Sequence, residues 1–235
     1  MACPCLKSSN RCTPKLSMTI ANPGIRIGII GTAGRKEDAE KLNPEKFQQM
    51  KAAVLGIIAP HTSKPITFVS GGAAVDDHIA VQLFLALPNT RLHLHLPAQY
   101  DMALHKFVEE PGKMFAPGNI ANYYHRQFWK RCRQTSLDEL HQAISCGAQA
   151  TVTPGFKQRN SKVANGADLM VALTFGEGAM LKDGGTLDCM TKFLQRHAGE
   201  SAHVDLHTMQ VYSPAVVTMQ QTQEARPATP ELSLE

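Results

Sequence analysis

The sequence lacks a long apolar run. No stretch of its 235 residues approaches the ~18 consecutive apolar residues that a membrane-spanning helix needs. The first basic residues, Lys7 and Arg11, are not followed by an apolar segment, so we expect neither a secretory signal nor a membrane partner. The 17 glycines and 14 prolines are ordinary for a globular protein, which excludes a fibrous or low-complexity chain.

Metal-binding cysteine patterns are also absent. Cys3, Cys5 and Cys12 match no zinc spacing, and no pair has the spacing CxxC. The remaining cysteines, Cys132, Cys146 and Cys189, are scattered. Reduced thiols account for this pattern, and we therefore expect a cytoplasmic protein.

No large excess of one charge is present. The chain has 24 basic and 20 acidic residues, a net charge of +4. Residues 1–24 carry three basic residues and no acid, and residues 213–235 carry one basic and three acidic residues, which leaves +3 on residues 25–212. This modest charge suits an anionic small molecule better than a nucleic acid, which normally requires a basic stripe.

Both ends of the chain lack hydrophobic periodicity. We expect a flexible arm over residues 1–24, a disordered tail over residues 213–235 and one folded domain over residues 25–212. Apolar runs at residues 25–30, 66–69 and 91–96 alternate with helical spacing of apolar residues. This βαβαβ order predicts an α/β domain with a Rossmann-like, doubly wound, mostly parallel sheet.

An insertion over about residues 100–149 interrupts this order. It holds half of the aromatic residues and should be helical over residues 119–133. Ser136 and Glu139 have the spacing of a capping box for a second helix, which Gly147 would end. Further strands are expected at residues 150–153 and 169–174, with a last edge strand at residues 204–209.

Small-residue turns occupy three places that follow predicted strands: residues 31–35, 70–73 and 184–186. Ligands of open α/β sheets lie at the carboxyl ends of the strands, where glycine lets backbone N–H groups approach a phosphate. The alternative is that each glycine only closes a tight turn. The motifs GxGxxG and Walker A are absent, so NAD-dependent hydride transfer and P-loop hydrolysis are disfavoured, and we expect no cofactor.

The turn residues Gly31-Thr32-Ala33-Gly34-Arg35, Ser70-Gly71-Gly72-Ala73 and Gly184-Gly185-Thr186 resemble those of the SLOG superfamily. This Rossmann-like group includes the DNA-processing A proteins, the Lonely Guy phosphoribohydrolases and nucleotide-sensing domains. The segment from Gly155 to Asn160 is similar to uncharacterised phage-type members. The resemblance implies a nucleotide ligand and a homodimer. Cys189 stands where Lonely Guy enzymes carry a glutamate, which argues against their activity.

We therefore predict that the protein binds or senses a nucleotide or nucleotide-derived phosphate compound. Arg35 either clamps a phosphate or is a solvated charge, Thr186 either donates to phosphate or caps a helix, and Tyr123 and Tyr124 either stack on a base or pack the insertion. His125 should titrate near neutral pH. The predicted ligand contacts are Gly31, Thr32, Gly34, Arg35, Ser70, Gly71, Gly72, Ala73, Asp77, Tyr123, His125, Arg126, Arg159, Asn160, Gly184, Gly185 and Thr186.

Two other functions remain open. The first is hydrolysis of a nucleoside monophosphate at its N-glycosidic bond, with Asp188 or Glu177 as the acid or base. The second is single-stranded DNA binding, for which residues 126–133 (RQFWKRCR) supply basic and aromatic groups. His93 and His95 share one strand face, as do His203 and His207, but half-exposed strand histidines are common and we expect no metal.

Overall fold

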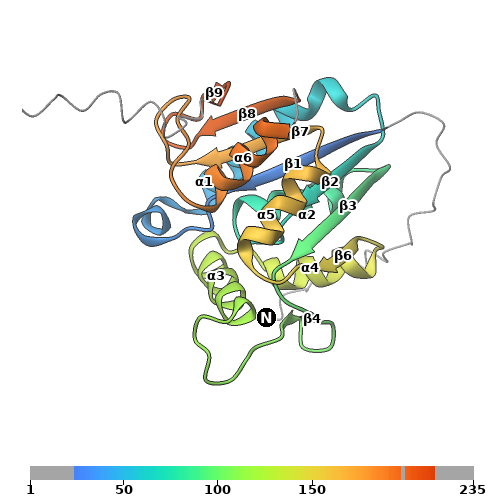
Figure 1. The fold of residues 1–235 in the computed structure, drawn as a ribbon, viewed down its shortest axis with the longest axis vertical. Helices are drawn as coiled ribbons and strands as arrows, with labels where there is room; N and C mark the ends of the chain where they lie inside the picture. Colours follow the sequence, from blue (N-terminus) through green and yellow to red (C-terminus); the bar gives the residue numbers. More distant parts are fainter. Residues whose placement is uncertain (1–23, 197–198, 215–235) are drawn as a thin grey trace, which may run out of the picture.

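The computed structural model describes residues 24–196 and 199–214. The predicted arm and tail lie outside these residues, apart from residues 24, 213 and 214. The centre is a seven-stranded sheet of order β6-β3-β2-β1-β7-β8-β9 (Figure 1). Its strands, in chain order, are β1 (Ile25–Gly31), β2 (Ile66–Ser70), β3 (Thr90–Leu96), β6 (Gln149–Val152), β7 (Leu169–Thr174), β8 (Glu200–Asp205) and β9 (Val211–Tyr212).

The sheet is parallel except for β9, which pairs antiparallel with β8. The order β3-β2-β1-β7-β8 is that of a Rossmann-like doubly wound sheet, so the predicted fold class is confirmed. Every residue of β7 is buried, because helices cover both faces of the sheet. Such a strand reads as a continuous apolar run, which is why residues 169–174 were recognisable in the sequence.

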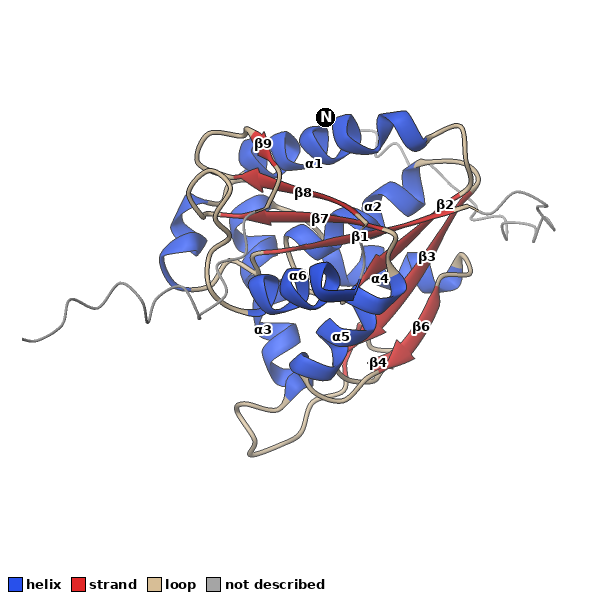
Figure 2. Ribbon diagram, turned by 45° about the horizontal axis from the view of Figure 1, so that its top comes forward, coloured by secondary structure: helices blue, strands red, loops and turns tan. Residues whose placement is uncertain are grey.

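Helices pack on the two faces (Figure 2). On one face lie α1 (Pro44–Ile58), α2 (Asp76–Ala86) and α4 (Ser136–Ser145), whose apolar residues join one core cluster with the sheet. On the other face lie α5 (Phe156–Gly166) and α6 (Gly185–Arg196), which share a second cluster. Short 3-10 helices, η1 (Lys36–Lys41) and η2 (Ala59–His61), complete the connections. No helix among the described residues combines the length and apolarity needed to cross a membrane.

The insertion is not purely helical, which corrects the prediction. Before α3 (Pro117–Cys132) it contains an antiparallel pair, β4 (Tyr100–Asp101) and β5 (Lys106–Phe107). Asn122 of α3 supplies the missing partner for β5, because its amide accepts from Phe107 N at 2.9 Å and donates to Phe107 O at 2.8 Å. The strands are too short to give an alternating pattern, so periodicity could not reveal them.

The capping box predicted at Ser136 and Glu139 is wrong. The residue before α4 is Thr135, which makes no side-chain cap. The Ser136 hydroxyl bonds Nδ1 of His125 at 2.8 Å, and the Glu139 carboxylate bonds His78 at 2.5 Å. Both side chains therefore serve contacts between helices rather than the helix end. Gly147 follows the helix end with a φ of +96°, as predicted.

The last predicted strand, at residues 204–209, is also misplaced. β8 ends at Asp205, whose carboxylate accepts bonds from His207 N at 2.8 Å and Thr208 Oγ1 at 3.1 Å. These bonds fold the chain into a turn, a property that aspartate brings to turns generally. The edge of the sheet is consequently β9 and not β8.

Candidate functional site

A cavity of about 440 Å³ lies at the carboxyl ends of β1, β2 and β7. We call it the inner cavity. The predicted turns on β1 and β2 and the turn before α6 all contribute to its wall, because parallel strands end at one edge of the sheet. Of the predicted ligand contacts it brings together Gly31, Thr32, Arg35, Gly71, Gly72, Ala73, Asp77, Arg159, Asn160, Gly184, Gly185 and Thr186.

The first turn packs tightly on α2. A Cβ atom at Gly31 would lie 2.0 Å from Oδ2 of Asp76 and 2.4 Å from the carbonyl oxygen of Leu173, so only glycine fits. The next residue, Thr32, donates its N–H to the same Asp76 oxygen at 2.5 Å. Burial raises the pKa of Asp76 well above its ordinary value, against the opposing effect of the Thr32 bond.

The second turn is held by Ser70 and Asp77. The Ser70 hydroxyl donates to the Asp77 carbonyl at 2.9 Å and accepts from Gly72 N at 3.1 Å. The Asp77 carboxylate accepts from Gly71 N at 3.1 Å. Ser70 is fully buried and does not line the cavity, so its hydroxyl shapes the turn. Val75, which precedes α2, has a φ of +69°, a strained conformation for a β-branched residue.

Arg159 and Asn160 lie in the first turns of α5. The Arg159 guanidinium stands 5.3 Å from the Phe156 ring centroid, and Nη1 is 3.5 Å from the Gly71 carbonyl. Its Nε is buried and bonds no acceptor among the described residues. Asn160 donates to Gly185 O at 3.1 Å and so ties α5 to α6. Arg159 thus holds a free donor at the cavity wall.

The N-termini of α2, α5 and α6 all border the inner cavity. Neither α2 nor α5 has a side-chain cap. The first N–H groups of a helix have no intrahelical partner, and the helix dipole makes this end electropositive. The three helices therefore place electropositive ends at the wall of the inner cavity.

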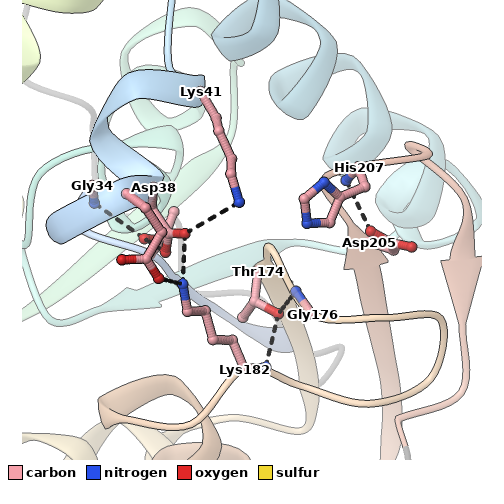
Figure 3. Close-up of polar contacts among 10 residues, drawn as sticks. Gly34, Asp38, Lys41, Thr174, Gly176, Lys182, Asp205 and His207 are labelled. Carbon is pink, nitrogen blue, oxygen red and sulfur yellow. Dashed lines mark hydrogen bonds and ion pairs between the residues drawn. The ribbon is translucent and has the colours of Figure 1, made fainter.

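The loop between β7 and α6 brings a cation that sequence reasoning missed. Lys182 donates to Glu37 at 2.5 Å and to Asp38 at 2.8 Å, both in η1 (Figure 3). Thr174 shapes this loop by accepting from Gly176 N and Lys182 N, each at 3.2 Å. All of these residues except Gly176 also line the inner cavity. A lone lysine in a loop gives no pattern from which its partners could be inferred.

His203 completes that loop and is not placed as a metal ligand. Its Nδ1 donates to Gly178 O at 2.9 Å, so its Nε2 accepts the Thr174 hydroxyl at 2.8 Å. Burial lowers its pKa, which favours this neutral form. On β3, His95 bonds Thr151 Oγ1 at 3.0 Å. Among the described residues, no group of three or more histidine, cysteine or acidic side chains could hold a metal.

His125 does not line the cavity, and the prediction that it titrates near neutral pH is wrong. It is buried in α3, where its Nε2 donates to Gly72 O at 3.2 Å and its Nδ1 accepts from Ser136. Burial lowers its pKa to about 3. Gly34 also lies away from the cavity wall, and its N–H donates to Thr32 Oγ1 at 3.1 Å. Both residues therefore bond to the turns without lining the inner cavity.

Tyr123 and Arg126 line a second cavity of about 770 Å³, which we call the outer cavity. Tyr124 borders both cavities. Its ring centroid is 5.3 Å from the Arg35 guanidinium. Phe156, which the sequence reading passed over, also borders both. No signal in the sequence marks Phe156, because the helix that it begins has no side-chain cap.

The catalytic candidates Asp188 and Glu177 line neither cavity. Partial burial pushes the pKa of Asp188 upward, but bonds from Lys192 at 2.7 Å and Asn160 at 3.0 Å outweigh it and hold that pKa below its usual value. Glu177 is exposed in the loop after β7. The neighbour of Asp188, Cys189, does line the inner cavity as a buried free thiol. Cys132 is likewise a buried free thiol.

Comparison with known proteins adds a relative of viral origin. No protein-family model matches the sequence. An uncharacterized protein of Acanthamoeba polyphaga mimivirus is 34% identical over 173 residues, an alignment that covers 72% of this chain and 90% of the relative. The identity and the coverage are both high enough to show common family membership. The chain therefore belongs to the same family as this mimivirus protein.

Proposed function

We propose that the inner cavity binds the phosphate group of a nucleotide or of a nucleotide-derived compound, and that the protein acts as a sensor or sequestering protein. The observation that carries this proposal is the convergence of Arg159 and the N-termini of α2, α5 and α6 on one cavity. Its volume of about 440 Å³ falls within the range of small-molecule sites, roughly 300–1,000 Å³.

The charges around the cavity support an anionic ligand. The acids Glu37 and Asp38 are already paired with Lys182. Burial raises the pKa of Asp77, although Arg159 and backbone N–H groups oppose the shift. Arg35 and Arg159 line the cavity and form no ion pair among the described residues. The Arg159 guanidinium bonds only neutral acceptors, the Gly71 carbonyl at 3.5 Å and Asn160 Oδ1 at 3.2 Å, so its charge is not neutralised by an ion pair. The donor fork of a guanidinium matches phosphate geometry.

Hydrolysis of an N-glycosidic bond is the alternative. Asp188 could serve only as a base near neutral pH, because its lowered pKa keeps it ionised. Its bonds to Lys192 and Asn160 would also have to break before it could reach the cavity. Binding without hydrolysis does not require Asp188 to leave its bonds to Lys192 and Asn160.

The test is isothermal titration calorimetry with ribose 5-phosphate, AMP and GMP. We expect binding to the wild type and at least a tenfold loss in Arg159→Ala, since a hydrogen bond to a charged group is worth about 1.5–3 kcal/mol. Lys130→Ala is the matched control, because Lys130 is an exposed cation of α3 outside both cavities. It should bind as the wild type does.

Failure of all three compounds to bind would contradict the proposal, as would unchanged affinity in Arg159→Ala. The same samples are assayed for released base. Release that disappears in Asp188→Asn would replace binding by hydrolysis as the function. Thermal melts of each variant show that the fold is intact.

A further inference from the structure

The outer cavity adjoins the inner one. Arg35, Ile120, Tyr124 and Phe156 border both. A ligand held by its phosphate in the inner cavity would reach the outer cavity past these shared residues. The outer cavity is also the larger, at about 770 Å³ against about 440 Å³.

Large apolar side chains border the outer cavity yet remain open to solvent. Met114 is 73% exposed, Phe115 is 79% exposed and Tyr123 is 50% exposed. Such side chains are usually buried, and covering them with an apolar group is favourable. Rings at the edge of a cavity offer flat faces on which another ring can stack.

Two arginines, Arg35 and Arg126, line the outer cavity. The Arg35 guanidinium stands at the junction, 5.3 Å from the Tyr124 ring centroid. Beyond it, the apolar walls carry Arg126, which faces Glu109 at 3.7 Å. This arrangement places a cation at the junction and aromatic side chains beyond it. It therefore fits a molecule with a phosphate at one end and an aromatic ring at the other.

Two polar side chains of the outer cavity that could read the edge of a ring, Asn119 and Glu109, are already engaged. The Asn119 amide accepts from Glu110 N at 2.8 Å and donates to the carbonyl oxygens of Glu110 and Lys113. The Glu109 carboxylate bonds Asn122 at 3.0 Å and Lys106 at 3.1 Å. These bonds remove Asn119 and Glu109 from base recognition, and stacking on the rings distinguishes poorly between bases because every base has a π face.

We infer that the outer cavity is a stacking site for the nucleobase of the ligand, with little discrimination between adenine and guanine. The inference rests on the proposed function, since the phosphate in the inner cavity places the base. Tyr123 and Phe115 are the residues that supply the stacking faces.

Calorimetric titration of ribose 5-phosphate, AMP and GMP tests it. AMP and GMP should bind at least tenfold more tightly than ribose 5-phosphate, and their affinities should differ less than fivefold. The double variant Phe115→Ala/Tyr123→Ala should lower both to the level of ribose 5-phosphate, whose own affinity stays unchanged. Trp129→Ala is the control, because Trp129 is 49% exposed on the same helix and borders neither cavity.

The outcomes separate this inference from the proposed function. Binding of ribose 5-phosphate with no gain from a base overturns the stacking site and leaves the proposed function standing. If AMP still binds more tightly than ribose 5-phosphate to the double variant, the stacking site is overturned as well. A fivefold or larger difference in affinity between AMP and GMP overturns the low selectivity. If none of the compounds binds, the proposed function itself has failed.

Discussion

His78 of α2 and Glu139 of α4 form a 2.5 Å bond between Nε2 and Oε2 across 61 residues of sequence. The His78 side chain is only 1% exposed. Burial pushes the pKa of Glu139 upward, but the bonds from His78 and Gln82 outweigh this effect and keep that pKa below its usual value. The pair therefore fixes the insertion to the helix whose N-terminus borders the inner cavity.

Loss of this pair should destabilise the protein. Glu139→Ala leaves the buried His78 without its acceptor, and we expect a loss of about 3 kcal/mol in the free energy of unfolding. Urea denaturation measures it. Asp138→Ala is the control on the same turn, because the Asp138 side chain is 65% exposed and its removal should cost less than about 0.5 kcal/mol. Equal losses in the two variants would contradict a structural role for the pair.

The buried His125 should make the stability depend on pH. Its folded pKa of about 3 lies below the ordinary 6.5, so the unfolded chain binds a proton that the folded chain does not as the pH falls below 6.5. Stability should then decrease toward acid, and at pH 5 this group costs about 2 kcal/mol.

The variant His125→Gln isolates that effect, since glutamine can still bond Gly72 and Ser136. The difference in unfolding free energy between wild type and variant should shrink by about 2 kcal/mol between pH 7.5 and pH 5. Contributions from other groups, such as His95, are common to both proteins and cancel. A difference that stays constant over this range would show that His125 is not the group responsible.

Two glycines should respond oppositely to alanine. Gly31→Ala places a Cβ atom 2.4 Å from the backbone oxygen of Leu173 and should cost about 3 kcal/mol through overpacking. Gly56 lies within α1 with open space around it, and Gly56→Ala should stabilise by about 0.5–1 kcal/mol. Thermal melts measure both changes. Destabilisation of similar size at both positions would refute the close-packing argument.

The ion pairs of Lys182 should tune phosphate affinity. Glu37 neutralises part of the Lys182 charge beside the inner cavity, so Glu37→Gln should raise the affinity for ribose 5-phosphate about two- to fivefold. Lys182→Ala leaves Glu37 without its cation and Asp38 with only Lys41 at 4.0 Å, and it should lower the affinity. Glu45→Gln, an exposed acid in the first turn of α1, serves as the control in the same titrations. Effects of the same sign in the two test variants would contradict this electrostatic role.

Much of the sheet could be predicted because its central strands are buried on both faces. β1 and β7 read as continuous apolar runs, and the glycine turns follow from the rule that parallel strands end together. This rule alone was enough to predict that Gly31, Gly71 and Gly185 converge on one cavity.

The remaining features depend on contacts between distant residues. The spacing of Ser136 and Glu139 favours a local capping box, but His125 and His78 compete for these side chains in the folded protein. The α5 helix begins at Phe156 without a side-chain cap, so no start signal marked it. Lys182 was missed for a similar reason, because its acids lie more than a hundred residues earlier in the chain.

The position of β1 at the middle of the sheet has a consequence for synthesis on the ribosome. β1 pairs with β2 on one side and with β7 on the other, and Arg26 bonds Asp168 across 142 residues. Until the last third of the chain emerges, β1 exposes an unpaired edge that can join other chains. Aggregation of truncated nascent chains, and a demand for chaperones that bind them, follow from the same strand order that forms the inner cavity.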